Sequence, residues 1–480
     1  MTLSNAHKIP KYDYLILLPI MALAFYIAFI PHHNYPYPLH VDEWINLVRF
    51  KGLMEAGNIT FAGSFLLEAG FHLFWGVFQT ISGISWMDIF RYFPGIILII
   101  TVLSVYILAQ RQGFGWEAAL FTCLIPTTVG ILGPSFLIAM SLGLLFIPLS
   151  LFLAFNFKTG WAYLSLFIFI SFLLTLHAPT AVGLAIILIP YILLNLKGSF
   201  KHSLGLTLAL AIPFLVPFPW IFHMLLPTAK LLFSAQTIPT YIALPRIIRA
   251  YGYLPILFCL LGTFLLAIRG GSKNYSLILG LLGLLVMLVV YYTFHYGVEI
   301  MYFRGLMYMM LAMSIVAGAG LMGVRKLRLP ARLNTWLKVP FITQNVGNIL
   351  CLALIALTLV MVIPVRQDTP YYHMIDREDY EAFVWIKDNV SEGYGRAVLD
   401  PWKATAFAAI TEKDIYTRIH SYPTAKDERV YTFLNNGCTD TAFLRGYGIS
   451  IVYSRQACNN PDLVEVRKNV YLLKKEGGES

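Results

Sequence analysis

Apolar residues recur along the chain in runs of about 20, and polar residues gather between these runs. A helix needs a run of about this length to cross the hydrocarbon core of a bilayer. Eleven such runs predict eleven membrane-spanning helices, and an odd number places the two termini on opposite sides of the membrane. The predicted spans are residues 13–31, 90–110, 116–133, 135–156, 161–177, 179–196, 204–222, 251–268, 275–293, 304–324 and 341–364.

Composition and charge divide the chain into two parts. Of the 480 residues, 58% are hydrophobic and 12% are charged, whereas a soluble domain carries roughly 25% charged residues. This excludes an ordinary soluble enzyme. Twenty basic and eight acidic residues precede position 365, and 15 basic and 17 acidic residues follow it. We therefore expect a basic transmembrane domain over residues 1–364 and a soluble domain over residues 365–480.

The basic residues of the loops predict an orientation. Cytoplasmic loops carry an excess of Lys and Arg. With a cytoplasmic N-terminus, thirteen basic residues of the membrane part fall in inside loops and seven in outside loops. This orientation places the C-terminal domain outside the cytoplasm, and it explains the net charge of +10 without nucleic-acid binding. The first span has no small-residue cleavage site, so we expect a retained anchor rather than a signal peptide.

The long outer loop over residues 32–89 holds a further apolar segment, "SFLLEAGFHLFWGVFQTISGIS". Counting it as a span would reverse every later loop and place the basic loops outside. We therefore expect interfacial helices here, with Glu68 and His72 four residues apart on one helical face. The many aromatic residues of this loop argue against disorder.

Acidic residues are absent from the interiors of the predicted spans. Ion-coupled carriers normally place ionisable groups near the middle of the bilayer, so this distribution argues against a transporter. The six acids of the membrane part that lie on the outer side are Asp42, Glu43, Glu55, Glu68, Asp88 and Glu299. Any chemistry is therefore expected at the outer membrane face.

The segment "HVDEWINLVRF" contains the strongest candidate, the adjacent carboxylates Asp42 and Glu43. Such a pair beside a lipid surface suits an enzyme that removes the proton of an acceptor hydroxyl. The alternative interpretation is structural, because acidic residues are also favourable at the N-terminus of an interfacial helix.

This first span, long outer loop and "DE" pair resemble the GT-C superfamily of membrane glycosyltransferases, which includes protein O-mannosyltransferases and the aminoarabinose transferases of lipid A. The stretch "FHLFWGVFQTISGISWMDIFRYFPGIILIITVLSVYILAQRQGFG" is similar to their interfacial helix, Arg-led span and basic turn. The resemblance implies a polyprenyl-phosphate-linked sugar donor, a glycan, lipid or protein acceptor, and transfer with inversion. It also implies that Asp42 is the general base and that Glu43 helps to orient the acceptor.

A phosphate-bearing donor would need a cation at the outer interface. Arg304 is the first candidate, because a guanidinium can bind a phosphate bidentately, and Glu299 and His295 accompany it in "HYGVEIMYFRGLMYMM". Arg304 could instead extend to lipid headgroups. The weaker candidates for substrate binding are Arg246, Arg249 and His177; the arginines could simply flank a span, and His177 could be a packing residue beside a proline that interrupts its helix.

The C-terminal domain is expected to be α/β, with helical segments and strands at "RAVLD", "ISIVYS" and "NVYLLKK". Its start is similar to the soluble domain of oligosaccharyltransferase catalytic subunits of the STT3 and AglB type. Their WWDYG motif, which recognises an asparagine sequon, is replaced here by "LDPWKATA". This departure argues against protein N-glycosylation. Asp400 and Trp402 are either acceptor-cleft or packing residues.

Cysteine spacing and short motifs exclude several cofactors. Cys438 and Cys458 both fall in the outside domain, where oxidising conditions permit a disulfide. No ligand spacing typical of a structural metal and no nucleotide-binding motif occurs in the sequence. A carboxylate pair with a phosphate donor could recruit Mg²⁺ or Mn²⁺, although Asp42 and Glu43 alone do not establish a metal site. The triplets at Asn58 and Asn389 match glycosylation sequons.

Two non-catalytic alternatives stay open. A carrier or flippase of lipid-linked saccharides would show paired halves and polar groups within the bilayer. A scaffold would keep the architecture without the activity, and the missing WWDYG motif is its one hint.

Overall fold

The computed structural model describes residues 13–57, 68–128, 131–216, 242–328, 340–367, 373–419 and 423–475. It divides into two compact units. The helical unit comprises Met1–His33, Thr60–Phe74 and Tyr92–Pro370, and the sheet unit comprises Asn34–Ile59, Trp75–Arg91 and Tyr371–Ser480. Two segments of the expected outer loop thus group with the C-terminal residues, and each unit is described by itself.

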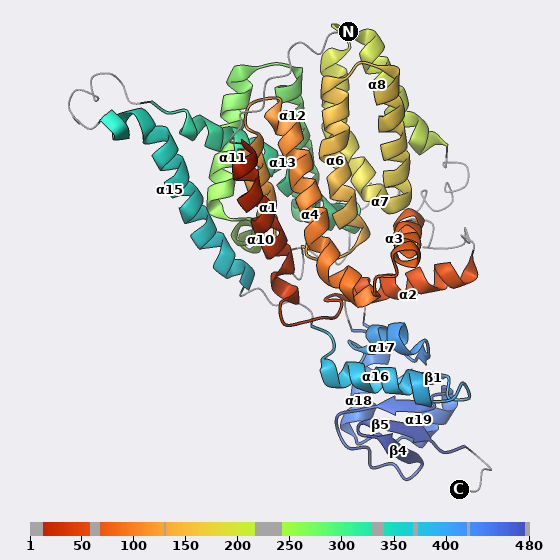
Figure 1. The fold of residues 1–480 in the computed structure, drawn as a ribbon. Coiled ribbons are helices and arrows are strands. Elements are labelled where there is room, and N and C mark those ends of the chain that lie inside the picture. The colour runs from red at the N-terminus through yellow and green to blue at the C-terminus, as the bar shows by residue number, and fades with distance from the viewer. Residues whose placement is uncertain are drawn as a thin grey trace. The chain divides into compact units, whose positions relative to one another are not determined.

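The helical unit is a bundle of long apolar helices (Figure 1). Seven helices among the described residues are long and apolar enough to cross a membrane, and an eighth span results if α10 and α11, bent by 85°, count as one. These helices support an integral membrane protein. The bundle also contains shorter helices. Its helices are α1 Asp13–Phe29, α4 Trp86–Gln110, α5 Gly115–Cys123, α6 Ala139–Asn156, α7 Gly160–Asn195, α8 Phe200–Leu215, α10 Leu244–Tyr251, α11 Tyr253–Arg269, α12 Ser272–Phe294, α13 Glu299–Arg325 and α15 Pro340–Gln367.

Helix α13 is the most buried of these candidate spans, with 89% of its apolar window inside the protein. It packs against α5, α7, α11, α12 and α15. Glycines allow the close approach to α11: a Cβ on Gly262 would lie 1.9 Å from the carbonyl oxygen of Val316, and one on Gly320 would lie 2.1 Å from that of Phe258. Small residues commonly permit such backbone contact between membrane helices.

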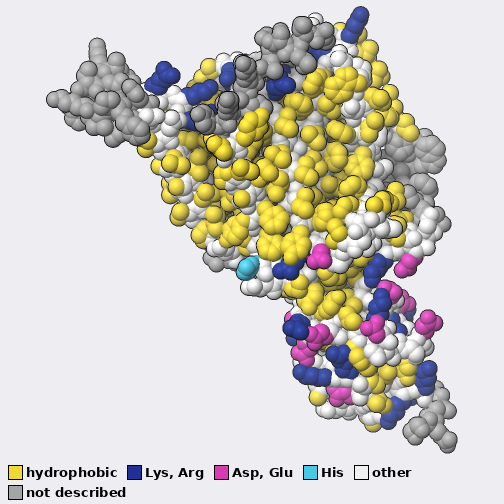
Figure 2. All heavy atoms as spheres, in the orientation of Figure 1, with side chains coloured by type: hydrophobic (Ala, Val, Ile, Leu, Met, Phe, Trp, Pro, Cys, Tyr) yellow, Lys and Arg dark blue, Asp and Glu magenta, His cyan; other side chains and the backbone are white. Residues whose placement is uncertain are grey.

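The helical unit presents an apolar surface. In the view of Figure 2, hydrophobic side chains cover the face of the bundle, and Lys and Arg side chains gather along its upper edge. This is the expected pattern for helices surrounded by lipid and bounded by a basic interface.

One predicted span differs in the structure, and two others share a single helix label. The span expected over 116–133 begins as α5 but loses helical structure after Cys123. Pro126 explains the break, because proline lacks the N–H of a helical hydrogen bond and disfavours helix at the residue before it. The spans expected over 161–177 and 179–196 are the two halves of α7, which His177 separates with non-helical dihedrals. The chain reverses at this point, because Lys158 Nζ just before α7 donates to Ser199 Oγ just after it at 3.1 Å. The span expected over 204–222 starts as α8, and its last residues lie outside the described part.

The sheet unit contains a five-stranded sheet of order β2-β1-β3-β5-β4. Strand β1 pairs in parallel with β2 and β3, whereas β5 pairs antiparallel with β3 and β4. Strands β1, β3 and β5 lie within the three segments that the sequence predicts as strands. The strands are β1 Arg396–Val398, β2 Asp414–Ile415, β3 Ile451–Tyr453, β4 Leu463–Arg467 and β5 Val470–Leu473, and the helices of the C-terminal segment are α16 Arg377–Asn389, α17 Ala404–Thr411, α18 Ala425–Asn435 and α19 Thr441–Gly446.

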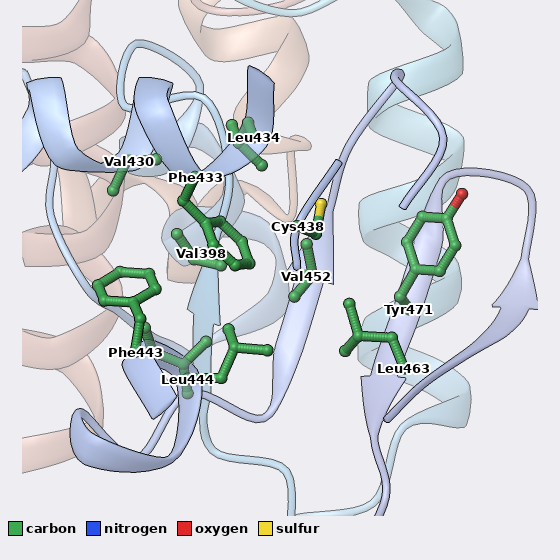
Figure 3. Close-up of a cluster of buried hydrophobic side chains, with 11 residues drawn as sticks. Val398, Val430, Phe433, Leu434, Cys438, Phe443, Leu444, Val452, Leu463 and Tyr471 are labelled. Carbon is green, nitrogen blue, oxygen red and sulfur yellow. The ribbon is translucent and has the colours of Figure 1, made fainter. Parts of the chain in front are cut away.

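A compact apolar core lies between the sheet and helices α18 and α19 (Figure 3). Val398 and Val452 from the sheet face Phe433 and Phe443 from these helices. Cys438 is buried in this core and forms a disulfide with Cys458, 20 residues further along. Closing a loop of that length stabilises a fold by about 3 kcal/mol in the chain-entropy model.

Helix α2, Val41–Ala56, belongs to the sheet unit because it packs on α17. Lys51 Nζ donates to the carbonyl of Ala409 and to Glu412 Oε1, at 3.0 Å each. Lys387 of α16 reaches the same carboxylate oxygen at 2.6 Å. Helix α3, Ala69–Ser82, contributes residues to both units and is too short for a membrane span.

Candidate functional site

Asp42 and Glu43 lie in the first turn of α2, and the residues before them fix its start. His40 is the N-cap residue, and its Nδ1 accepts the backbone N–H of Asp42 at 3.1 Å. Glu43 Oε2 accepts the backbone N–H of Leu39 at 2.7 Å and that of His40 at 3.2 Å. This capping box satisfies donors at a helix start that favours negative charge.

The two carboxylates differ in exposure. Glu43 is fully buried, whereas 22% of the Asp42 side chain is exposed and one of its oxygens lies 3.6 Å from His40 Nδ1. Asp42 is therefore the carboxylate that solvent or a substrate reaches. Glu43 holds the segment that presents Asp42.

A cavity of about 560 Å³, here called the Tyr35 cavity, opens in the same unit. Two stacked aromatic pairs border it: the ring centroids of Tyr35 and His373 are 4.1 Å apart, and those of Tyr37 and Tyr380 are 4.7 Å apart. Aromatic faces and charged groups together suit a ligand with both apolar and polar surfaces. The side chains that line the cavity include Tyr35, Tyr37, His373, Arg377, Lys403 and Arg455.

The segment just before α2 lines this cavity with Tyr35 and Tyr37. Burial raises the pKa of Tyr35, and the charge of Glu43 raises it further, whereas the backbone N–H of Ile375, which donates to the phenol oxygen at 3.3 Å, lowers it. The net direction is upward, so Tyr35 keeps its proton near neutral pH.

Asp379 is the buried centre of the charges around the cavity. It is fully buried and accepts hydrogen bonds from Lys403 Nζ at 2.8 Å and from Tyr453 Oη at 2.6 Å. Arg455 Nη2 lies 2.9 Å from Asp379 Oδ1, the oxygen that also accepts from Tyr453. Arg455 pairs with Asp376 as well. The sequence analysis missed this cluster. The capping sequence from Asp376 to Asp379 was visible, but nothing local indicated Lys403 or Arg455.

In the helical unit, His177 lies in a hydrogen-bonded group where α7 is interrupted. Its Nδ1 is 2.8 Å from Thr180 Oγ1 and 3.3 Å from Tyr308 Oη, and these two oxygens are 3.0 Å apart. Arg304 lies one turn before Tyr308 on α13. The structure thus brings together two candidates, His177 and Arg304, that the sequence could only name separately.

Thr180 and Tyr308 were missed by the sequence analysis, although both positions carried a signal. Tyr308 follows Arg304 by four residues on α13, so these two share a helical face. Thr180 follows His177 by three residues, just after the break in α7. The fit is close, because a Cβ on Gly183 would lie 2.6 Å from the Tyr308 ring.

The remaining candidates take other positions. Glu299 is the first residue of α13, and His295 ends α12 in the left-handed conformation, with a φ of 59°. Arg246 and Arg249 are exposed on α10. Glu68 and His72 lie at the start of α3, where His72 is buried against the ring of Phe71.

Two positions from the C-terminal segment have local hydrogen bonds. Asp400 Oδ1 accepts the backbone N–H of Trp402 at 3.0 Å and the hydroxyl of Tyr431 at 3.2 Å, which closes the turn before α17. Asn389 Nδ2 donates to the carbonyl of Trp385. Asn58 lies outside the described residues.

Within the described ranges, no group of three or more His, Cys, Asp or Glu side chains is arranged to hold a metal ion. One oxygen of Glu43 is already used by two backbone N–H groups. The described side chains around Asp42 therefore do not form a complete metal site.

Comparisons of the sequence with protein-family models and with curated proteins give no match. Solved structures match over almost the whole chain. The oligosaccharyltransferase of Archaeoglobus fulgidus in the apo form is 11% identical with a TM-score of 0.61, over 93% of this chain and 70% of that one. ArnT from Cupriavidus metallidurans bound to undecaprenyl phosphate is 11% identical with a TM-score of 0.56, over 97% and 98%. The mycobacterial arabinofuranosyltransferase AftD is 16% identical with a TM-score of 0.55, over 95% and 37%.

The archaeal oligosaccharyltransferase, AglB, has also been solved with an inhibitory peptide and a dolichol-phosphate, and with Zn and sulfate. All three proteins belong to one superfamily of membrane enzymes. The resemblance that the outer-loop carboxylates and the span pattern indicated is confirmed at the level of the fold.

Proposed function

We propose that this chain, which has the fold of the GT-C membrane glycosyltransferases, transfers a sugar from a polyprenyl-phosphate-linked donor to an acceptor at the outer membrane face. The observation that carries the proposal is Asp42: an accessible carboxylate at a rigidly capped helix start, in a chain whose fold matches ArnT along almost the full length of both proteins. The bound undecaprenyl phosphate of ArnT and the dolichol-phosphate of AglB support a lipid-linked donor.

In the proposed reaction, Asp42 takes the proton of an acceptor hydroxyl, and the hydroxyl oxygen forms a bond to the anomeric carbon of the donor sugar. The bond from that carbon to the phosphate oxygen breaks, and its electron pair leaves with the polyprenyl phosphate. A single displacement of this kind inverts the anomeric configuration.

Glu43 has a positioning role in this proposal. The sequence analysis had it orient the acceptor, but the carboxylate is buried and accepts two backbone N–H groups. Its negative charge fixes the segment from Leu39 to Asp42, so that the base does not have to be ordered during the reaction.

For the donor phosphate we propose Arg304 in the helical unit, one turn before Tyr308, whose hydroxyl oxygen lies 3.3 Å from His177 Nδ1. A fixed guanidinium stabilises a leaving phosphate as negative charge develops on it. A divalent cation is not assigned a step, because the described residues around Asp42 do not complete a metal site.

The domain arrangement that we propose is a transmembrane domain over residues 1–364 and an α/β domain over residues 365–480 on the outer side. The acceptor is a glycan, a lipid or a protein. AglB has been solved with an acceptor peptide containing a sequon, but this chain lacks the WWDYG motif of that enzyme class.

The proposed base is tested by comparing Asp42→Asn with a matched control, Glu55→Gln. Both acids lie on α2, and Glu55 is exposed at the opposite end of the helix. Loss of a general base typically costs 10²–10⁴-fold in rate, so we expect Asp42→Asn to lose transfer of radiolabelled sugar while Glu55→Gln keeps it. A folded Asp42→Asn protein with parental activity would remove Asp42 from the reaction.

A further inference from the structure

A second cavity, of about 710 Å³, lies in the helical unit between two chain turns. One turn joins α4 to α5 and supplies Arg111, and the other joins α11 to α12 and supplies Arg269 and Lys273. The volume is within the range of small-molecule sites, roughly 300–1,000 Å³. The sequence analysis treated these three residues only as topology signals. We call this cavity the basic cavity.

The basic cavity gathers positive charge without a compensating acid. Among the described residues, its lining contains Arg111, Arg269 and Lys273 and no Asp or Glu. Within the described residues, none of the three forms an ion pair. Arg111 and Lys158 also repel the ammonium of Lys273 electrostatically. Like charges held together raise the energy of the empty site, and a bound anion would offset this cost.

Hydrogen bonds hold two of these cations in place. Arg269 Nη1 donates to the carbonyl of Gln112 at 2.8 Å and so links the two turns. Lys273 Nζ donates to Asn156 Oδ1 at 3.0 Å, which ties it to the end of α6. The positive-inside rule explains basic residues in cytoplasmic loops, but it does not explain why three of them line one cavity.

The backbone leaves room for a ligand. Gly113, Gly270 and Gly271 have φ values of 87°, 65° and 92°, a region that residues with a Cβ rarely adopt. Gln112, Ser272 and Asn274 add polar groups to the lining. The cavity therefore offers cations and neutral donors around a space with no acidic group.

We propose that the basic cavity binds a phosphate group, either on a lipid headgroup or on a free phosphate compound. Guanidinium and ammonium groups are the usual protein partners of phosphate, and basic pockets between membrane helices are typical sites for phosphate-bearing headgroups. The loop charges predict that this end of the helical unit faces the cytoplasm. The basic cavity does not include Asp42. The proposal is therefore independent of the reaction that the chain catalyses.

The test uses the purified full chain in neutral detergent with phosphatidic acid labelled on its acyl chain. We compare R111Q/K273Q with a control pair, K197Q/K201Q. Lys197 lies between α7 and α8 and Lys201 in the first turn of α8; both are exposed and neither lines the cavity. Each basic group near a membrane surface contributes about fivefold to binding an anionic lipid. The cavity pair should therefore weaken binding about 25-fold and the control pair less than about twofold.

Competition with inorganic phosphate separates the two sources. Displacement of the labelled lipid by inorganic phosphate assigns the cavity to a free phosphate compound, and failure of displacement assigns it to a headgroup. Thermal unfolding of both variants establishes that they are folded. Equal weakening in the two pairs, or no saturable binding by the parent, would overturn the proposal.

Discussion

Asp379 allows a quantitative test of the charge cluster beside the Tyr35 cavity. The substitution Asp379→Asn keeps the size of the side chain and removes its charge. Lys403, with 17% of its side chain exposed, and Arg455, with 41% exposed, would then lose a common carboxylate partner. The hydroxyl of Tyr453 would lose a charged acceptor as well.

The expected cost follows from this burial. Removing one partner of a buried ion pair costs about 3–5 kcal/mol, and the partial exposure of Arg455 places Asp379→Asn near the lower end, about 3 kcal/mol. Because each 1.4 kcal/mol is a factor of ten, amides of the sheet unit that exchange through its unfolding should exchange about a hundredfold faster. Exposed Asp388 on the same helix supplies the control, Asp388→Asn.

Hydrogen exchange with mass spectrometry on the full chain measures this effect in peptides from β3 and α16. Asp388→Asn should leave their exchange rates unchanged. Exchange in Asp379→Asn within a factor of about three of the parent would show that the cluster contributes little to stability, and the reasoning from burial would then be wrong.

Three other predictions concern stability and donor binding. The hydrogen bond from Lys387 holds the pKa of Glu412 below its ordinary value. Glu412 therefore stabilises the sheet unit at pH values above its ordinary pKa, and this contribution is lost as the pH falls through the lowered pKa. Glu412→Gln should flatten the pH dependence of stability below about pH 4.5, and an unchanged profile would contradict this. Gly262→Ala should reduce the yield of folded protein, because its Cβ would lie 1.9 Å from a carbonyl oxygen of α13. The control Gly52→Ala, at an exposed position of α2, should be neutral or stabilising by about 0.5–1 kcal/mol in thermal unfolding. Arg304→Gln should raise the KM for a polyprenyl-phosphate donor about tenfold or more, and exposed Arg246→Gln should not; equal KM values would refute the phosphate role.

Local sequence patterns predicted the features that depend on neighbouring residues. Apolar runs located most of the long helices, since span length is set by the bilayer, and Pro179 indicated the interruption of α7 at His177. The segment after Cys123 was mistaken for helix because its hydropathy was given more weight than Pro126. In that case the backbone chemistry of one residue outweighed the apolar pattern.

Features assembled from distant residues were beyond the sequence. Lys51 and Glu412 are 361 positions apart, and no pattern near either residue indicates that α2 packs with the C-terminal segment. The Tyr35 cavity likewise combines residues near positions 35, 375, 403 and 455. Asp42 could be chosen from the sequence, but the division between an accessible Asp42 and a buried Glu43 needed the capping geometry.

The central claim is that this chain forms a glycosidic bond at the expense of a polyprenyl-phosphate donor. The most direct test incubates the parent protein in nanodiscs with labelled polyprenyl-phosphate sugars and an envelope extract, and follows both halves of the donor. The account predicts equal amounts of free polyprenyl phosphate and of a sugar product with inverted anomeric configuration, and neither from Asp42→Asn. A donor recovered intact by the parent, but moved across the membrane in proteoliposomes, would contradict the account and indicate a carrier.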